Sequence, residues 1–281
     1  MQKNTPLFAF GLAVAVLICV VPFFYTHFML KIICGLASGL ILHVCAFKKL
    51  DFDDSALYVF VGFFIVLNFA FGDISSNQGA NLLIYLSIYL LGSIPFGLIL
   101  ALVFAKVNIK SEGSKSIGAT NVLRVVKQTD PALAKKLAIA TVVLDFAKAA
   151  CPILIAKFMG ADANMLWSIG VFAVLGHCFS IYLFLDGGKG IATGAGVMAV
   201  LLPLELLVAL FVWFAVGKVF RISSLASLAG ALSFIIASFV FHYDMPEIHT
   251  HAPILIICFI IFYKHIPNIK RLIFKEECKV I

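Results

Sequence analysis

A glycine-rich stretch around Lys189 is the clearest candidate for chemistry in the sequence. It reads FLDGGKGIATGAG over residues 184–196 and places Gly187, Gly188 and Gly190 around the single lysine. Glycine lets backbone amides turn toward an anion, and a helix beginning near Gly190 would add its positive N-terminal dipole. The spacing of a Walker A loop is absent. The stretch predicts a phosphate site of another kind; taken alone, a flexible basic turn is the competing interpretation.

A second segment, SEGSKSIGATNVLR, combines small residues, hydroxyl groups and a guanidinium over residues 111–124. Small residues permit close backbone approach, and arginine presents a planar fork that matches phosphate oxygens. An ordinary loop that leads into a capped helix is the alternative. The candidate ligands are Ser114, Gly118, Thr120, Asn121 and Arg124.

Two further polar segments follow apolar runs. RISSLAS holds Ser224, although serine at such a boundary is most often a helix N-cap. KHIPNIKRLIFKEE holds His265, Asn268 and Glu277, although basic tails beside a membrane usually fix topology or touch anionic lipid. If the tail is helical, His265 and Asn268 share one face, and Pro267 counts against that.

The composition indicates where these segments lie. Of the 281 residues, 63% are hydrophobic and 12% charged, and the mean hydropathy is +1.10. Soluble domains hold roughly 45–50% apolar and about 25% charged residues. We therefore expect an all-α, polytopic integral membrane bundle of about ten transmembrane helices. The predicted helices are Leu7–Tyr25, Phe28–Phe47, Leu57–Phe71, Leu82–Ala105, Lys136–Phe158, Asn164–Leu185, Gly190–Leu202, Leu204–Phe220, Leu225–Phe241 and Pro253–Lys264.

The basic residues predict the orientation. With ten spans, nearly all lysines and arginines of the loops fall on one side, and the opposing loops GDISSNQGAN and HYDMPEIHTH have none; Lys31 and Lys157 are exceptions. This bias predicts a cytoplasmic face that carries all four polar segments, with both termini cytoplasmic. The segment Gly190–Leu202 is short, and a broken or re-entrant helix is the alternative there.

Other residues carry less information. The net charge of +7 lacks a basic face with aromatic platforms, so we expect no nucleic-acid partner. The seven cysteines show no metal spacing, and the three histidines of HYDMPEIHTH fit no standard metal pattern, so no metal is expected. Asp145 and Lys148 lie three apart inside a predicted span, as a helix-steadying ion pair or as functional groups.

The motifs together resemble one enzyme family. In order the chain reads LGSIPFG, GSKSIGATNVLR, LDFAKA, GHCFSIYLFLDGGKGIATGAG, RISSLAS and HIPNIKRL. This series, over about residues 82–277, resembles the bacterial acyl-phosphate:glycerol-3-phosphate acyltransferases. The resemblance implies a seven-helix acyltransferase domain over residues 81–281, preceded by a 1–80 extension with three helices. It implies a multi-pass protein of the bacterial inner membrane with its site on the cytoplasmic face.

The implied reaction moves an acyl group from acyl-phosphate to the 1-hydroxyl of glycerol 3-phosphate, giving lysophosphatidic acid and phosphate for phospholipid synthesis. No cofactor is implied. The implied partners are the two substrates and membrane lipids, with functional coupling to the enzyme that makes acyl-phosphate as a candidate. The catalytic candidates are His265, as ligand first and base second, Asn268 and Asn121. The substrate-binding candidates are Ser114, Gly118, Thr120, Arg124, Gly187, Gly188, Lys189, Gly190, Thr193, Ser224 and Glu277.

The chain departs from the family pattern at five positions, which are Lys115, Ser116, Asp186, Ile266 and Lys275. The family usually has glycine where this chain has Lys115 and Lys275, and a basic residue where it has Asp186. A carboxylate beside the glycine loop weakens its attraction for anions unless Lys115 compensates. Two rival functions follow: an acyltransferase-like protein without activity, and a transporter of a phosphorylated small molecule, which would predict inverted repeats. The HxxxxD signature of another acyltransferase class is absent.

Overall fold

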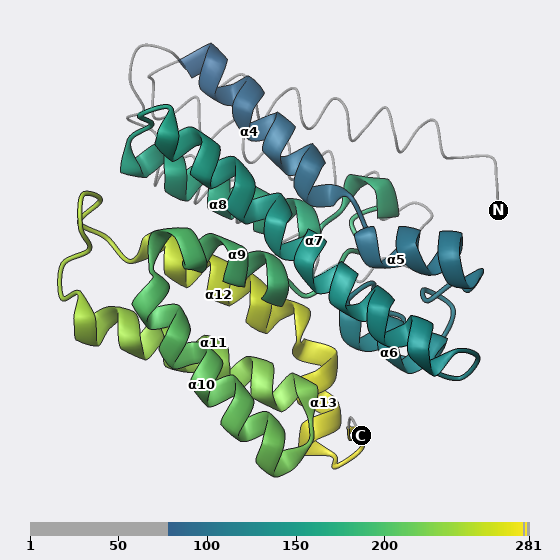
Figure 1. The fold of residues 1–281 in the computed structure, drawn as a ribbon. Helices are drawn as coiled ribbons and strands as arrows, with labels where there is room; N and C mark the ends of the chain where they lie inside the picture. The colour runs from purple at the N-terminus through teal and green to yellow at the C-terminus, as the bar shows by residue number, and fades with distance from the viewer. Residues whose placement is uncertain (1–77, 278, 280–281) are drawn as a thin grey trace, which may run out of the picture. The chain divides into compact units, whose positions relative to one another are not determined.

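The computed structural model describes residues 78–277 and 279. The chain divides into two compact units, Met1–Ile84 and Tyr85–Ile281, and the account below concerns the second. The predicted helices Leu7–Tyr25, Phe28–Phe47 and Leu57–Phe71 lie outside the described residues. In the described range, every regular element is helical, which confirms the all-α prediction (Figure 1). The helices are α4 (Gln78–Ser93), α5 (Phe96–Leu100), η2 (Ala101–Ala105), α6 (Ala119–Val126), α7 (Pro131–Phe158), α8 (Ala163–Cys178), η3 (Ile181–Leu183), α9 (Ile191–Leu201), α10 (Pro203–Phe220), α11 (Ser223–Phe241), α12 (Ala252–Lys264) and α13 (Ile266–Ile273).

The predicted apolar runs in this range all form helices, but they do not all have the length of a span. Five stretches are long and apolar enough to cross a membrane, and a sixth arises if α12 and α13, bent by 56°, count as one. Helix α9 has 11 residues and therefore a length of about 16 Å, whereas a hydrocarbon core is about 30 Å thick. This length favours a helix that does not cross alone, and the count of ten spans stays a prediction.

The run predicted as one helix over Leu82–Ala105 is broken. Helix α4 ends at Ser93 and α5 begins at Phe96, because Pro95 has no backbone N–H to continue the helical ladder. Lys148 of α7 donates from its Nζ to the Ile94 carbonyl at 3.1 Å. The buried ammonium is thereby a second donor to this carbonyl, which also accepts from the Phe96 amide at 3.1 Å.

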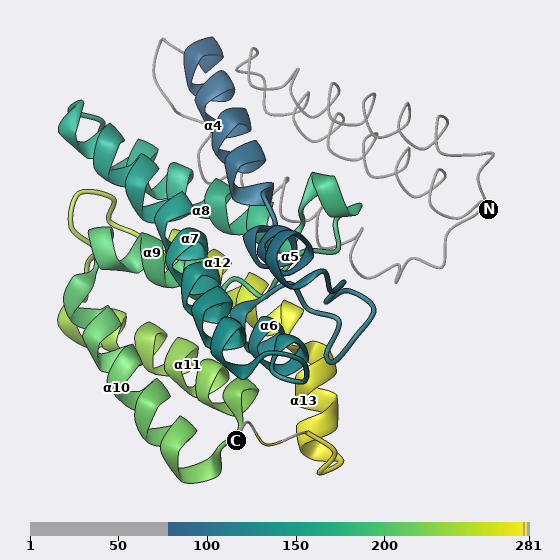
Figure 2. The same ribbon diagram turned by 45° about the vertical axis from the view of Figure 1, so that its right-hand side comes forward.

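Helix α7 packs against α6, α8 and α9 and connects the parts of the site. It begins with Pro131 at its first turn, where a missing N–H has no cost, and the Asp130 side chain accepts from the amides of Ala132 and Leu133 at 3.0 and 2.9 Å. The cap places the start five residues before the predicted Lys136. Helices α10 and α11 run side by side in both views (Figure 1, Figure 2).

Two short helices were not among the predicted spans, and both lie at the same end of the bundle (Figure 1, Figure 2). Helix α6 is held by an apolar cluster of Ala101, Ile109, Val122, Val125, Val126, Ala134 and Leu137. Helix α13 accommodates Pro267 in its first turn, so the proline does not prevent the tail from being helical. These helices carry Arg124 and Asn268.

The end of α13 explains one departure from the family pattern. The amide of Glu276 donates to the Arg271 carbonyl at 2.7 Å, and that of Lys275 to Leu272 at 3.2 Å. This is the Schellman pattern, in which the first residue after the C-cap adopts a left-handed conformation and is usually glycine. Lys275 holds this position with φ 60°. The turn reverses the chain and brings Glu277 back toward α11.

Lys275→Gly is expected to raise the free energy of unfolding by about 0.5–1 kcal/mol, because glycine adopts positive φ without the Cβ penalty. The measurement is the thermal midpoint in detergent, with activity unchanged. Lys270→Gly is the matched control, since Lys270 is exposed but lies within α13. The control should lose stability, by about 1 kcal/mol. A loss of stability in both variants would contradict the assignment of Lys275 to the left-handed position at the end of α13.

Candidate functional site

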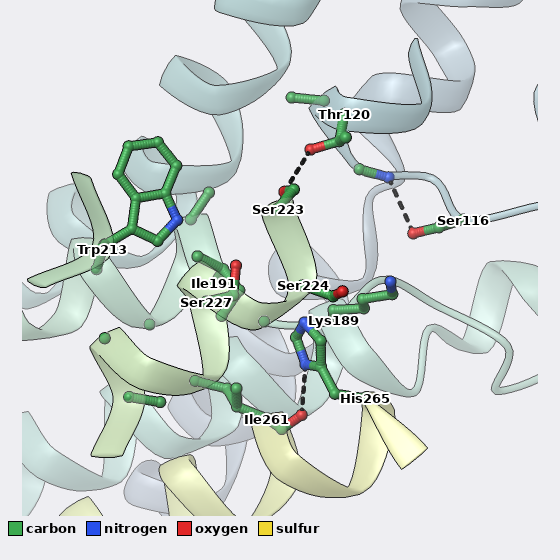
Figure 3. A pocket seen from close by; sticks show the side chains of 18 of the residues that line it. Ser116, Thr120, Lys189, Ile191, Trp213, Ser223, Ser224, Ser227, Ile261 and His265 are labelled. Atoms are coloured by element: carbon green, nitrogen blue, oxygen red, sulfur yellow. Dashed lines mark hydrogen bonds between the residues drawn. The ribbon is translucent and has the colours of Figure 1, made fainter. Parts of the chain in front are cut away.

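One cavity of about 870 Å³ gathers most of the predicted site residues. Its walls come from helices α6 to α13, from the loop before α6 and from the glycine loop (Figure 3). One part is polar, and the other is lined by apolar residues of α9 to α12. The predicted residues that line it are Ser114, Gly118, Thr120, Asn121, Arg124, Lys189, Gly190, Ser224, His265, Asn268 and Glu277.

Gly187, Gly188 and Thr193 are predicted ligands that do not line the cavity. The amides of Gly187 and Gly188 donate to the carbonyls of Cys178 and His177 at 3.2 and 2.8 Å. The expectation that these amides hold a phosphate is therefore corrected: they fix the loop to the end of α8. Thr193 is fully buried, because on α9 it lies on a different face from the cavity-lining Gly194.

Lys189 and Gly190 are the part of the glycine loop that faces the cavity. Gly190 precedes α9 with φ 83°, a conformation that glycine adopts freely, and a Cβ there would lie 2.9 Å from the Cys178 Sγ. Burial lowers the pKa of Lys189 to about 8; Glu277 opposes the shift, and the cations Arg271, Arg124 and Lys264 add to it. Three cations and one carboxylate act on this half-buried ammonium, so a phosphate bound beside it would supply further negative charge.

Asn121 organises the loop before α6 instead of presenting a free amide. Its Nδ2 donates to the carbonyls of Ile109, Glu112 and Ser116, and its Oδ1 accepts from the Ser114 amide at 2.8 Å. Because both of its N–H groups are occupied by backbone oxygens, the expected role as an oxyanion donor is corrected to one of shaping this loop. The same contacts set the position of Ser114.

The C-terminal segment forms a polar cluster over the cavity. The Glu277 carboxylate accepts from Ser224 Oγ at 2.7 Å, from Asn268 Nδ2 at 2.6 Å and from Arg271 Nε at 2.6 Å. Burial raises the pKa of Glu277, but these three hydrogen bonds and the charge of Arg271 outweigh it and lower the pKa overall. Arg271 was not predicted as a site residue; its spacing of three from Asn268 on one helix was the available signal.

His265 is buried at the junction of α12 and α13. Its Nδ1 lies 2.7 Å from the Ile261 carbonyl, which can only accept, so Nδ1 carries the hydrogen. The neutral ring then has a free lone pair on Nε2, on the side where Figure 3 places Ser224 and Lys189. The geometry allows the ring to accept a hydrogen bond or a proton from a ligand hydroxyl.

Asp186 has cationic partners other than the one expected. Its carboxylate pairs with Lys110, whose Nζ also donates to the Asp186 carbonyl at 3.0 Å, and Lys264 lies 4.0 Å away. Lys115 is exposed and has no ion pair among the described residues. Lys110 and Lys264 therefore compensate this carboxylate, and the expectation for Lys115 is corrected.

Two further sets of ionisable groups form ion pairs. Asp145 and Lys148 form an ion pair of 2.8 Å that also includes His177, and Asp145 and His177 line the cavity. In the loop between α11 and α12, His249 pairs with Asp244, and His242 pairs with Glu205 of α10. In the described part of the chain no group of three or more His, Cys, Asp or Glu could hold a metal ion.

Known proteins match this chain over nearly the same residues as the predicted acyltransferase domain, 81–281. The sequence profile described as Glycerol-3-phosphate acyltransferase matches residues 82–275. The glycerol-3-phosphate acyltransferase of Campylobacter jejuni subsp. doylei is 71% identical over 201 residues, which are 72% of this chain and 99% of the relative. That of a Nitratiruptor species is 58% identical over 200 residues, 71% of this chain and 96% of the relative.

Two solved structures of PlsY, an integral membrane glycerol 3-phosphate acyltransferase, are also similar. The glycerol 3-phosphate form is 34% identical with a TM-score of 0.63, and the lysophosphatidic acid form is 33% identical with a TM-score of 0.61. Each comparison covers 71% of this chain and 95% of the other. From these matches and the shared membrane fold, we conclude that the chain belongs to the glycerol-3-phosphate acyltransferase family.

Proposed function

We propose that this chain transfers a fatty acyl group from acyl-phosphate to the 1-hydroxyl of glycerol 3-phosphate, as an O-acyltransferase of the EC 2.3.1 class. The observation that carries the proposal is the cavity described above, in which Lys189, Arg124 and Arg271 share one space with the apolar walls of α9 to α12. Such a cavity suits an amphiphilic reaction, in which phosphate groups meet cations while an acyl chain packs against apolar side chains.

Acyl-phosphate is already activated, so a covalent acyl-enzyme is unnecessary. The 1-hydroxyl oxygen bonds to the acyl carbon, the bond from that carbon to the phosphate oxygen breaks, and the hydroxyl proton leaves with inorganic phosphate. The protein must bring two mutually repelling anions together and neutralise them. Lys189 and Arg124 supply charge for this task, and His265 accepts the hydrogen bond of the attacking hydroxyl.

The other predicted residues have positioning or binding roles in this proposal. Ser114 and Thr120 provide hydroxyl groups on the wall formed by α6 and its preceding loop, and Gly118 and Gly190 allow close approach. Ser224 and Asn268 bind through the cluster centred on Glu277. The proposed acyltransferase domain is 81–281, and the 1–80 segment is an extension to it. The family match over residues 82–275 of this chain supports this boundary.

The proposed setting is the bacterial inner membrane, with the cavity on the cytoplasmic face and both termini cytoplasmic. The loop lysines and arginines support this orientation, since they gather on one side of the predicted topology. The enzyme that makes acyl-phosphate is the proposed functional partner, because it supplies the donor at the same face.

The proposal is tested with protein purified in detergent, glycerol 3-phosphate and either acyl-phosphate or acyl-CoA as donor. We expect lysophosphatidic acid and an equal amount of phosphate with acyl-phosphate, and no product with acyl-CoA. A known active family member serves as the control for the assay. Turnover with acyl-CoA alone would overturn the donor assignment, and no turnover with either donor would favour the inactive homologue.

The charge of Lys189 predicts a pH dependence. Its pKa of about 8 lies below that of an ordinary lysine, so the side chain is cationic below about pH 8 and neutral above it. The substrate phosphates have a second pKa of about 6 and keep their charge in this range. The KM for the phosphate substrates should therefore rise up to about tenfold per pH unit above pH 8. Lys189→Arg should remove this rise, and a flat wild-type profile would contradict the assignment.

A further inference from the structure

The buried Asp145–Lys148–His177 cluster determines which nitrogen of His177 carries a hydrogen. All three side chains are nearly inaccessible. Lys148 Nζ lies 2.8 Å from Asp145 Oδ1, 2.8 Å from His177 Nδ1 and 3.1 Å from the Ile94 carbonyl. An ammonium has N–H donors and no lone pair, so the Ile94 carbonyl and His177 Nδ1 must accept its hydrogen bonds, while the contact with Asp145 Oδ1 is an ion pair.

His177 Nδ1 is therefore an acceptor, and the hydrogen of the neutral ring resides on Nε2. The Asp145 carboxylate does not reverse this arrangement. It lies 3.5 Å from His177 Nδ1, beyond the separation at which Lys148 contacts the same nitrogen. The ion pair with Asp145 keeps Lys148 charged and so keeps the ring in this tautomer.

The hydrogen on Nε2 points to the glycine loop. A Cβ on Gly188 would overlap Nε2, and the Gly188 amide donates to the carbonyl of His177 itself at 2.8 Å. His177 lines the same cavity as Lys189. Among the described residues the structure gives Nε2 no hydrogen-bond partner, whereas Nδ1 is fully engaged. A donor that faces a cavity without a protein acceptor indicates an acceptor on a ligand.

We propose that His177 Nε2–H donates a hydrogen bond to a phosphoryl oxygen of a substrate held beside Lys189, with Lys148 and Asp145 as the residues that position it. The proposal deepens the proposed function and rests on it. The proposal also explains why residue 188 is glycine, because any side chain there would overlap the donor. The phosphoryl group is that of acyl-phosphate or of glycerol 3-phosphate, and separate KM values for the two distinguish them.

Two amide substitutions distinguish the roles of the two ring nitrogens of His177. In His177→Gln the side-chain amide nitrogen reaches the place of Nε2 and keeps the donor. In His177→Asn the shorter amide offers its oxygen to Lys148 in place of Nδ1 but presents no donor to the cavity. We expect kcat/KM of the glutamine variant within about threefold of wild type, and that of the asparagine variant about 10- to 100-fold lower, the range for one hydrogen bond to a charged group. His177→Phe should match the asparagine variant.

Folding is followed by the thermal midpoint of each variant in detergent. If His177→Asn does not fold, Gly188→Ala is the second variant, because its Cβ would overlap Nε2 and so displace the imidazole from its place beside the cavity. Equal activity of the folded Asn and Gln variants, or full activity of Gly188→Ala, overturns the proposal. Failure of the proposed function would be seen separately, because the wild-type protein would then show no turnover. Binding of inorganic phosphate, measured by calorimetry, then decides: weakening by His177→Asn but not by His177→Gln supports the donor, and equal binding overturns it.

Discussion

Lys189→Met is expected to lower kcat/KM for acyl transfer by about 10²- to 10³-fold, the loss typical when one preorganised charge stabiliser is removed. The lysine is the only cation of the glycine loop and is partly shielded from water, where its interaction with a phosphate is stronger than at the surface. Methionine keeps the length and apolar contacts of the side chain, so the fold should be retained. The measurement is steady-state phosphate release with each substrate varied in turn.

Lys218→Met is the matched control for this change. Lys218 is exposed on α10 and does not line the cavity. It should retain the activity and the thermal midpoint of wild type. Activity of Lys189→Met within threefold of wild type would remove Lys189 from the proposed phosphate site.

Glu277→Ala should lower kcat/KM by about 10- to 100-fold, mostly through KM for the phosphate substrates. Two effects oppose each other. Removing the carboxylate takes a negative charge away from an anion site, but it also leaves Ser224, Asn268 and Arg271 without the acceptor that orders them. The second effect should dominate, because three short hydrogen bonds, one to a guanidinium, are lost together.

Two variants separate these effects for Glu277. Glu277→Gln keeps one amide oxygen as acceptor and should lie between alanine and wild type. Glu276→Ala is the control, since Glu276 is exposed and next in the chain. An increase in phosphate affinity in Glu277→Ala would show that charge repulsion outweighs the ordering.

Sequence patterns predict the long helices well because lipid requires apolar side chains over the length of a span. They predict α6 and α13 less well, since these short helices combine polar and apolar faces and owe their stability to local packing and turns. At the break before Pro95, the Lys148 ammonium contacts the Ile94 carbonyl, and no local pattern places that group beside Ile94.

In the candidate site too, the sequence predicts which residue types are present but not which way their polar groups point. The motifs identify the loops that reach the cavity, but they do not say which amides are already occupied. Gly187 and Gly188 bond back to α8, and Asn121 bonds to its own loop. His177 was not predicted as a site residue, because its role depends on its contact with Lys148, which lies 29 positions earlier in the chain. Spacing along the chain carries no information about such a pair.

The contact between Lys110 and Asp186 has an evolutionary consequence. It joins two loops that both border the cavity, and Lys264 lies beside it. A charge reversal at one end of such a contact creates a like-charge pair unless the other end changes too. Positions 110 and 186 should therefore covary within the family, so that relatives with a basic residue at 186 lack lysine at 110. Asp186 would then mark a lineage in which both loops changed together while the glycine loop retained its lysine.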